Sequence, residues 1–437
     1  MRQSDKMSID INTLSSTSSQ IPVWLITLII GLSFILIQSK WDASLIESFS
    51  MTPKEMPGVT GIANLQPALG KALLGLFGGI LLLWPSYKSF QYRLTPLLFF
   101  AGYLSFCFAS VLWSAEIKLT IRNLLTMMFF IAGILGTVRH LSTRQLIDSA
   151  IVIAFMFIAL GLTAEIVHGT FIPLHSNYRF AGTMHPNSQG TVCAILVLAT
   201  FCSLKQTEPK RHLYLAAMII GVLFLCLTKS RSNIFGCFLI IYLTSFWKSS
   251  FRIKLLLIFM PLNFVCLAVL TASFFGFDFL EGFSGLINVG RDLDTSDIAS
   301  LNNRIPLWIN LKFFFLQRPL LGYGYHGFWT PDMAELFFNE FGWIIPDGHS
   351  VIVDLLLQLG IMGFLLYGLS VLCVFYWIVI DCITNGTPSG FFTFTMILLA
   401  ITSGLVESDF MDPKSFGAFV TSVALFNVCI VKKEKSQ

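Results

Sequence analysis

Long apolar stretches separated by short polar connections make up most of the chain. A helix that crosses the hydrocarbon core of a bilayer needs about 20 predominantly apolar residues. Scanning the sequence for such stretches predicts about twelve membrane spans, at residues 21–38, 66–85, 95–113, 121–138, 146–167, 188–203, 212–228, 233–247, 253–275, 351–380, 391–406 and 416–431. The pattern therefore predicts an all-α polytopic integral membrane protein.

Two segments interrupt this pattern. The first, residues 168–190, lies between the fifth and sixth spans and is rich in polar side chains. The second is a large loop whose many Phe, Trp and Tyr residues argue against disorder. The predicted organisation is a tail at 1–20, nine spans within 21–275, the large loop at 276–350, three spans within 351–431 and a tail at 432–437.

The large loop has helical patterns of its own. Trp308 and Phe315 recur at helical spacing, which predicts an amphipathic helix over residues 303–317. A second short helix is expected to begin at Pro331, with Thr330 as its cap. We therefore expect the loop to pack on the bundle.

Composition supports the membrane assignment. Hydrophobic residues make up 55% of the chain and charged residues only 12%, which is more apolar surface than a soluble domain of this length can bury. None of the nine cysteines lies in the large loop, so we predict no disulfide framework and no cysteine-based metal site. The net charge of +4 comes with basic inner loops and gives no support for nucleic-acid binding.

Lysine and arginine predict the orientation. Most of them fall in alternate connections together with both termini, so these connections and both tails are predicted to be cytoplasmic. A smaller set of cations falls on the opposite, outer side, namely Arg179, Lys229, Arg231 and Arg304, accompanied by His349. Permanent positive charge on that side suits a phosphate-bearing, lipid-linked substrate.

Arg231 is the first candidate for binding a diphosphate. It lies in the short turn 228–233 between two spans, where a membrane lipid presents its headgroup, and Lys229 adds a second cation. Arginine offers a fixed fork of donors that matches phosphate oxygens. The structural alternatives are a snorkelling interfacial arginine for Arg231 and salt bridges within the outer loops for Arg179 and Arg304.

His349 is the candidate general base. A neutral imidazole is the side chain best suited to accept a hydroxyl proton near pH 7. Asp354 is close enough in sequence to orient this imidazole, but the sequence leaves that geometry open. We expect His185 and Asn187 to hold sugar hydroxyls or phosphate oxygens, and His185 and Glu407 are the other candidates for the base.

Two further features have competing interpretations. Tyr323, in the aromatic turn at residues 322–329, either stacks on a sugar ring or belongs to an interfacial aromatic belt. Asp292 and Asp294 have a spacing seen in metal-dependent glycosyltransferases, but they stand in a polar segment that is typical of an exposed loop. We therefore predict no metal site, and no cofactor.

Several short motifs follow one another in a characteristic order. They are Arg179-Phe-Ala-Gly-Thr-Met-His-Pro-Asn187, Ser230-Arg231-Ser232, Asn303-Arg304-Ile-Pro-Leu-Trp308, Pro319-Leu-Leu-Gly-Tyr-Gly324, and His349-Ser350 leading into Leu356-Leu-Gln-Leu-Gly360. Over roughly residues 170–410 this order resembles the superfamily of O-antigen ligases and Wzy-type polysaccharide polymerases. The Gly-Tyr-Gly turn and Val406-Glu407-Ser408 are most similar to the exopolysaccharide-polymerase (ExoQ-like) branch.

The resemblance implies a GT-C-like fold and a metal-independent glycosyltransferase at the periplasmic face of the bacterial inner membrane. The implied reaction moves a glycan from a polyprenyl diphosphate carrier to a saccharide hydroxyl, and the implied partners are that donor, the saccharide acceptor, the lipid bilayer and other polysaccharide-assembly proteins. Within this class we favour a polymerase of exopolysaccharide or O-antigen repeat units. The alternative is a ligase that transfers the glycan to lipid A core.

A transporter of lipid-linked saccharides is a more distant alternative. Transporters often have duplicated halves and charges near the middle of the bilayer. Here the polar residues gather at one face and no internal repeat is evident.

Overall fold

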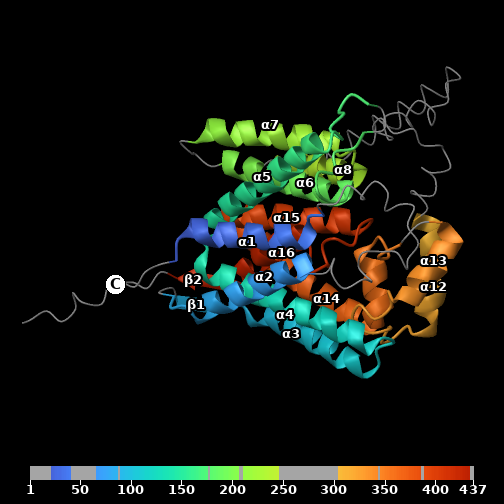
Figure 1. Ribbon diagram of the computed structural model, residues 1–437. Coiled ribbons are helices and arrows are strands. Elements are labelled where there is room, and N and C mark those ends of the chain that lie inside the picture. Colours follow the sequence, from blue (N-terminus) through green and yellow to red (C-terminus); the bar gives the residue numbers. More distant parts are fainter. Residues whose placement is uncertain are drawn as a thin grey trace, which may run out of the picture.

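A computed structural model describes residues 21–40, 65–86, 89–175, 178–205, 210–245, 304–342, 345–384 and 388–433. Within this part of the chain a helix occurs at every predicted span (Figure 1): α1 (Val23–Gln38), α2 (Leu65–Leu83), α3 (Leu94–Ala109), α4 (Ile117–His140), α5 (Thr143–Val167), α6 (Pro186–Leu204), α7 (Arg211–Leu227), α8 (Arg231–Ser245), α14 (Val351–Thr384), α15 (Pro388–Gly404) and α16 (Phe416–Cys429). The predicted span at 253–275 lies outside the described residues.

Six of these helices are long and apolar enough to cross a membrane within the described ranges: α2, α3 with the 3-10 turn Ser110–Leu112, α4, α5, α6, and α14 as far as Ile380. Helices α1, α7, α15 and α16 are shorter apolar helices. The fold is therefore that of an all-α polytopic membrane protein, and the total of twelve spans stays a prediction.

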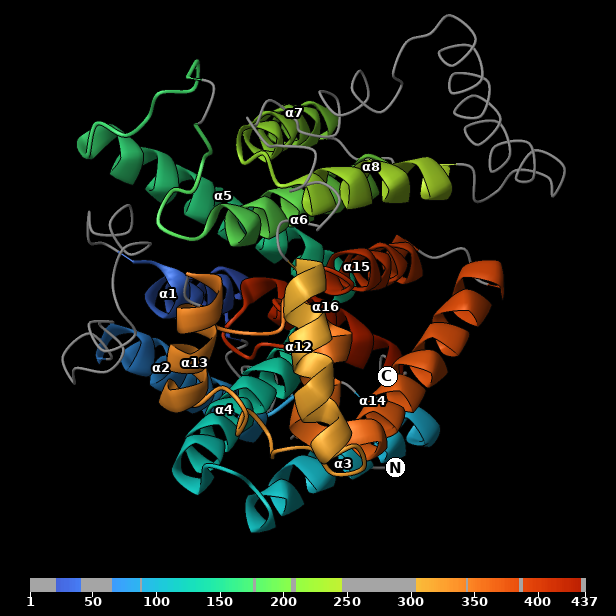
Figure 2. The same ribbon diagram turned by 90° about the vertical axis from the view of Figure 1, so that its right-hand side faces the viewer.

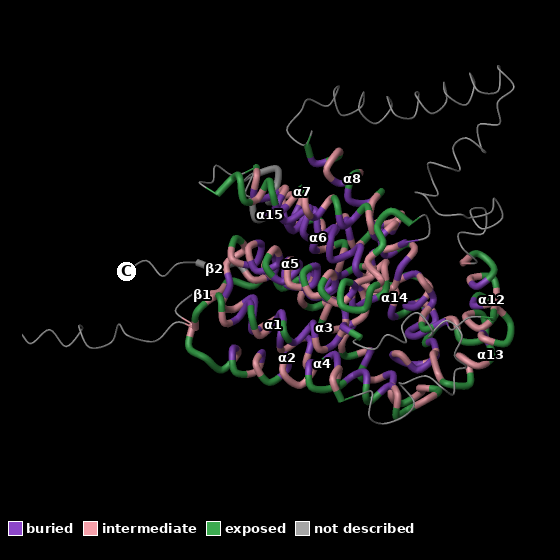
Figure 3. Tube along the Cα trace, turned by 45° about the horizontal axis from the view of Figure 1, so that its top comes forward, coloured by how far each residue is buried: buried purple, intermediate pink, exposed green. Residues whose placement is uncertain are grey.

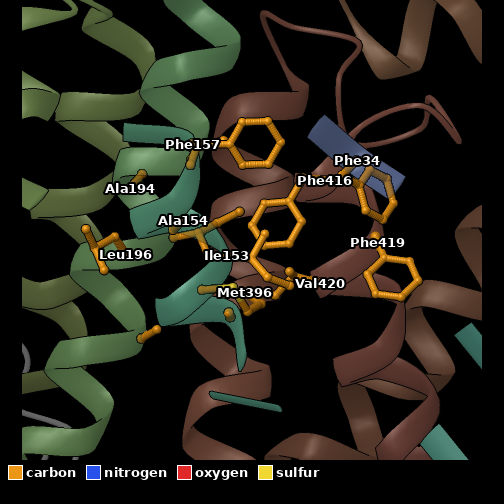
Figure 4. Close-up of a cluster of buried hydrophobic side chains, with 14 of the residues drawn as sticks. Phe34, Ile153, Ala154, Phe157, Ala194, Leu196, Met396, Phe416, Phe419 and Val420 are labelled. Carbon is orange, nitrogen blue, oxygen red and sulfur yellow. The ribbon is translucent and has the colours of Figure 1, made fainter. Parts of the chain in front are cut away.

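The helices pack closely around α6 and α16. Residues 192–199 of α6 are almost completely buried (Figure 3). Phe416 of α16 lies 5.8 Å from both Phe34 of α1 and Phe157 of α5, measured between ring centroids (Figure 4). Because lipid tails are as apolar as these side chains, such van der Waals packing, rather than transfer from water, holds the membrane helices together.

A short antiparallel pair of strands was not predicted from the sequence. Strand β1 (Ser89–Tyr92) follows α2 and pairs with β2 (Ile430–Lys433), which follows α16. The pair lies at one end of the bundle (Figure 1). It ties the connection between α2 and α3 to the C-terminal part of the chain.

Two helices from the large loop lie at the other end of the bundle. They are α12 (Arg304–Gln317) and α13 (Pro331–Phe341), and Figure 2 views them from that end, which we call the α12–α13 end. Both were predicted, and the Thr330 hydroxyl accepts the N–H of Met333 as the expected cap of α13. Leu311 and Phe337 are buried on the inner sides of these helices.

Helix α14 is broken at Gly360, which the sequence analysis treated as part of one continuous span. Gly360 has a φ of 62°, and its neighbours Ile361 and Met362 donate their N–H groups to the carbonyls of Pro319 and Leu320 instead of to their own helix. The turn after α12 therefore satisfies backbone groups that the break leaves free, as any buried helix end requires.

The same turn also forms hydrogen bonds with the part of α14 that precedes the break. Tyr323 and Gly324 donate their N–H groups to the carbonyls of Leu357 and Gln358, at 2.9 and 2.8 Å. The segment 351–359 is thus a short separate helix held by the turn at residues 319–324. This arrangement fixes the residues that precede it, including His349.

Gly360→Ala tests the break. A Cβ at Gly360 would lie 2.3 Å from the carbonyl oxygen of Leu320, and a positive φ is strained for any residue with a Cβ. We expect the substitution to lower the free energy of unfolding by at least about 1–3 kcal/mol, seen as a lower thermal unfolding midpoint of the solubilised protein. Gly368→Ala in the same helix is the control because a Cβ there meets nothing within 4 Å. Equal midpoints for both variants would contradict the assignment.

Candidate active site

The candidate site lies at the α12–α13 end of the bundle (Figure 2). It is assembled from segments that are far apart in the sequence: the loop before α6, the turn between α7 and α8, the start of α12, the turn before α14 and the loop after α15. Each segment carries at least one of the predicted residues. The helices bring these segments together as described below.

The loop before α6 is held by a buried carboxylate. Glu165, near the end of α5, accepts the backbone N–H groups of Ala181 and Gly182 at 2.9 and 2.7 Å and the hydroxyl of Tyr178. The N–H of Phe180 bonds to the carbonyl of Leu227 at the end of α7. These contacts fix Arg179 between the two segments.

A chain of polar contacts links four predicted residues. The guanidinium of Arg179 donates to the Asn187 side-chain oxygen at 2.8 Å, and the Asn187 amide donates to Glu407 Oε1 at 2.7 Å. Arg304 donates to the same Oε1 at 2.6 Å, and the side chains of Arg304 and Glu407 are only 15% and 10% exposed. Such a shielded, charge-assisted contact is stronger than a surface ion pair. Glu407 is therefore the centre that joins the loop before α6 to α12.

The turn between α7 and α8 is fixed to the same centre. Asn233 donates to the Asn187 carbonyl at 2.9 Å and to the Ser230 hydroxyl at 3.0 Å. Lys229 has a φ of 50°, a conformation that non-glycine residues rarely adopt. Partial burial, and next the charge of Arg304, lower the pKa of Arg231. The cations of α8 and α12 therefore lie close enough to repel one another, and an anion between them would relieve that repulsion.

The turn that carries His349 is also strained and well supported. His349 has a φ of 49°, and its N–H bonds to the side chain of Asp347 at 2.8 Å. The Oδ1 atom of Asp347 lies 3.4 Å from Nδ1 of the imidazole. The indole N–H of Trp308 donates to the Gly348 carbonyl at 2.8 Å, so α12 holds the turn from one side.

Asp354 supports the backbone of this turn, and Asp347 is the acid beside the imidazole. The Asp354 carboxylate accepts the N–H of Gly348 at 3.0 Å and the indole N–H of Trp329 at 2.9 Å, together with the hydroxyl of Ser408. The sequence suggested Asp354 as the residue that orients His349 and left this geometry open. In the structure Asp347, not Asp354, lies beside the imidazole. Ser408 follows Glu407 directly, so the loop after α15 supports both halves of the site.

His185 lies among the cations. Its Nδ1 accepts the N–H of Asn187 as the N-cap of α6. Part of His185 is exposed, but the surrounding protein, followed by the charge of Arg179, lowers the pKa of His185 to about 4. His185 is therefore neutral at pH 7 with its proton on Nε2, which makes it a hydrogen-bond donor toward the site.

An acidic neighbour is partly protonated near neutral pH. Burial, followed by the negative charges of Glu407 and Asp347, raises the pKa of Asp409 to about 7, against the opposing hydrogen bond from Ser188. In this described cluster Arg179, Arg231 and Arg304 thus outnumber the other two acids beside them, Glu407 and Asp347. The balance favours an anionic ligand.

The structure does not bring every predicted residue into this cluster. The hydroxyl of Tyr323 bonds to the Phe314 carbonyl and the Gln317 side chain at 3.0 and 3.1 Å, in contact with the end of α12. Lys229 stays a predicted substrate contact, and only its position in the turn between α7 and α8 supports that role. Asp292 and Asp294 lie outside the described residues. No group of three or more potential metal ligands occurs in the described ranges.

Some supporting residues escaped the sequence analysis. Glu165 is an ionisable residue near the end of an apolar span, a position that by itself suggests a buried partner or a functional role. Asp347 stands two residues before His349, but only the folded turn brings its carboxylate to Nδ1. Trp308 was recognised as part of a motif, while its bond to Gly348 depends on tertiary packing.

A family model matches part of the chain. Residues 216–368 match the family model described as O-Antigen ligase. This match covers α12, the turn at residues 319–324, His349 and the broken part of α14. Over these residues it supports the predicted resemblance to the O-antigen ligase superfamily, while the resemblance to the exopolysaccharide-polymerase branch stays a prediction. No curated protein matches the chain.

Glu165→Ala tests the support of the loop before α6. The substitution leaves two buried backbone N–H groups without their acceptor, and each costs about 1–3 kcal/mol. We expect a clearly lower thermal unfolding midpoint and faster proteolysis of the loop around Arg179. Lys312→Ala, at an exposed side chain on α12, is the control and should change the free energy of unfolding by less than about 0.5 kcal/mol. A Glu165 variant as stable as this control would contradict the role.

Proposed function

We propose that the protein is a membrane glycosyltransferase that moves a saccharide from a polyprenyl diphosphate carrier to a hydroxyl of a second saccharide. The observation that carries the proposal is the gathering of three arginines and two histidines from separate segments around Glu407. The O-antigen ligase domain supports the same reaction class. The proposed topology has twelve spans and a GT-C-like fold, with both termini in the cytoplasm and the α12–α13 end facing the periplasm.

The reaction needs charge stabilisation at the leaving group. The bond between the anomeric carbon and the diphosphate oxygen breaks, and its electron pair leaves with the diphosphate. Arg231, at the start of α8, is the proposed ligand of that group because its guanidinium forms two parallel bonds to phosphate oxygens and stays charged throughout. Arg179 and Arg304 lie beside it, while Glu407 holds Arg304 in position.

The acceptor hydroxyl must lose its proton as the new bond to the anomeric carbon forms. We assign this proton to Nε2 of His349. Asp347 beside Nδ1 favours the tautomer with the proton on Nδ1 and stabilises the imidazolium that forms. His185 carries its own proton on Nε2, so it suits donation to a substrate oxygen better than proton abstraction. No cofactor or metal takes part in the proposed reaction.

We favour a repeat-unit polymerase of the exopolysaccharide type over a ligase that modifies lipid A core. Analysis of surface glycans in a deletion strain separates the two. Single repeats accumulating on the carrier, with no polymer, would support the polymerase. Full-length chains stranded on the carrier would indicate the ligase, and unchanged glycans would contradict both.

Arg231→Lys tests the diphosphate ligand. Lysine keeps the positive charge but loses the planar fork, so we expect a loss of at least about tenfold in transfer, the equivalent of one charge-assisted bond. The measurement is the initial rate in purified protein at matched amounts of inserted enzyme. Arg211→Lys, at the opposite end of α7, is the matched control and should keep full activity. Wild-type activity of the Arg231 variant would refute the assignment.

His349→Ala tests the general base. Loss of a general base typically reduces turnover by about 100 to 10,000-fold, and we expect donor binding to stay nearly unchanged. In the wild type, activity should fall on acidification as the base becomes protonated, and the residual activity of His349→Ala should lack this dependence.

His185→Gln provides the control for the pH profile. Since the pKa of His185 is about 4, its imidazole stays neutral between pH 5 and 7 and does not contribute to a decline in that window. The variant should therefore keep the acid-side decline of the wild type. If the decline disappeared in His185→Gln and persisted in His349→Ala, the two roles would have to be exchanged.

A further inference from the structure

A second set of cations lies at the α12–α13 end, on different helices from the first. Lys414, just before α16, lies 3.9 Å from Asp412 through its ammonium group and bonds to the same side chain through its backbone N–H at 3.0 Å. Lys71 of α2 is close enough to Lys414, Asp412 and Arg122 for their charges to interact. Within this described cluster three cationic side chains, Lys71, Arg122 and Lys414, accompany the carboxylate of Asp412.

His326 completes the cluster from the turn after α12. It has a φ of 52°, and its N–H bonds to the Gln358 side chain at 3.0 Å. The surrounding protein, followed by the charge of Lys414, lowers the pKa of His326 to about 4, against the attraction of Asp412. Its imidazole is therefore a neutral hydrogen-bonding group beside the cations.

Helix packing explains why Lys71 and Arg122 are neighbours. Helices α2 and α4 are in close contact, because a Cβ at Gly75 would meet the side chain of Phe129 and one at Gly78 would meet the backbone of Gly133. Continuing this register by one or two turns brings residue 71 toward the turn of α4 that carries Arg122. Lys71 and Arg122 therefore lie on nearby turns of two closely packed helices.

A small, partly open apolar cavity borders this cluster. Its volume is about 70 Å³, and it is lined by α3, α4, α14, α16 and two loops, with Tyr103, Ile131, Tyr325, Tyr367, Met411 and Pro413 among the lining residues. Three of these residues are chain neighbours of the polar cluster: Tyr325 precedes His326, and Met411 and Pro413 flank Asp412. The cluster and the cavity thus share one wall.

The two cation sets lie on opposite sides of α16. In Figures 1 and 2 helices α15 and α16 run between the pair α6 and α8, of which α8 begins at the proposed donor ligand Arg231, and the pair α2 and α4. The segment between α15 and α16 connects the two sides, with Glu407 at one and Lys414 at the other. A reaction that joins two lipid-borne saccharides needs two separate sites, one for each lipid headgroup.

We propose that Lys71, Arg122, His326 and Lys414 bind the phosphate of a second lipid, the lipid-linked acceptor, whose first hydrocarbon units enter the cavity beside them. This site rests on the proposed function, because that function supplies the two lipid substrates. A phosphate complements the excess of positive charge, and the apolar lining complements a lipid chain. Donor and acceptor would then approach the space between Arg231 and His349 from opposite sides of α16.

The test uses substrates that act in one direction only. The donor is a polyprenyl-diphosphate oligosaccharide whose acceptor hydroxyl is methylated, and the acceptor is a polyprenyl-linked saccharide with a phosphonate in place of the anomeric phosphate. For Lys71→Gln/Lys414→Gln we expect the KM for the acceptor to rise about tenfold or more, as expected for the loss of charge-assisted bonds. The KM for the donor and kcat should change less than about twofold.

The control is Lys118→Gln/Lys312→Gln, which removes two exposed cations at the same end of the bundle and should leave both KM values unchanged. A second variant, Ile131→Trp, fills the cavity without changing charge and should also raise the acceptor KM selectively. An unchanged acceptor KM in both test variants, or a rise in the donor KM instead, would overturn the proposal.

Binding of the radiolabelled acceptor phosphonate to solubilised protein separates this proposal from the proposed function. We expect Lys71→Gln/Lys414→Gln to weaken this binding and Arg231→Gln to leave it intact. If the wild type bound the acceptor in this way but transferred no sugar, the reaction assignment would fail while the site stood. Displacement by phosphatidylglycerol at equal concentration would show a general phospholipid site and overturn the acceptor assignment.

Discussion

The break of α14 at Gly360 is the constraint on which the α12–α13 end depends. A continuous helix would satisfy its own backbone groups and would have no reason to bind the turn at residues 319–324. Because the helix is interrupted, carbonyl groups of that turn accept the N–H groups of Ile361 and Met362. N–H groups of the same turn donate to the carbonyls of Leu357 and Gln358. The large loop is thereby attached to the bundle through backbone bonds, which are costly to leave unmade inside a membrane protein.

Side chains extend this attachment to the proposed catalytic groups. Asp354, on the short helix before the break, holds the turn of His349 and receives bonds from Trp329 and Ser408, so it joins the large loop to the segment after α15. Glu407, the neighbour of Ser408, then carries the connection to Arg304 and, through Asn187, to Arg179. Acidic residues here serve to position cations and a histidine, and the arginines in excess of their acidic partners are suited to a phosphate.

Hydrophobic patterning was sufficient to predict the helices and their approximate ends, including α12 and α13, because each buries a periodic set of apolar side chains. The order of the motifs located the residues that the structure gathers around Glu407. The break at Gly360 was missed, since Gly360 lies in an apolar stretch and hydropathy carries no information on φ. The role of Glu165 and the assignment of Asp347 rather than Asp354 to His349 depend on contacts between segments, which no local pattern encodes. Tyr323 was chosen for its ring, whereas its hydroxyl bonds to α12.

The central claim is that the α12–α13 end breaks a sugar–diphosphate bond and forms a glycosidic bond in one reaction. The most direct measurement incubates the purified wild-type protein in detergent with a polyprenyl-diphosphate oligosaccharide labelled separately in its sugar and in its phosphate. We expect released polyprenyl diphosphate and new glycosidic bonds to appear in equal amounts. A protein that moves the labelled lipid across a reconstituted membrane intact, with neither product formed in detergent, would contradict it.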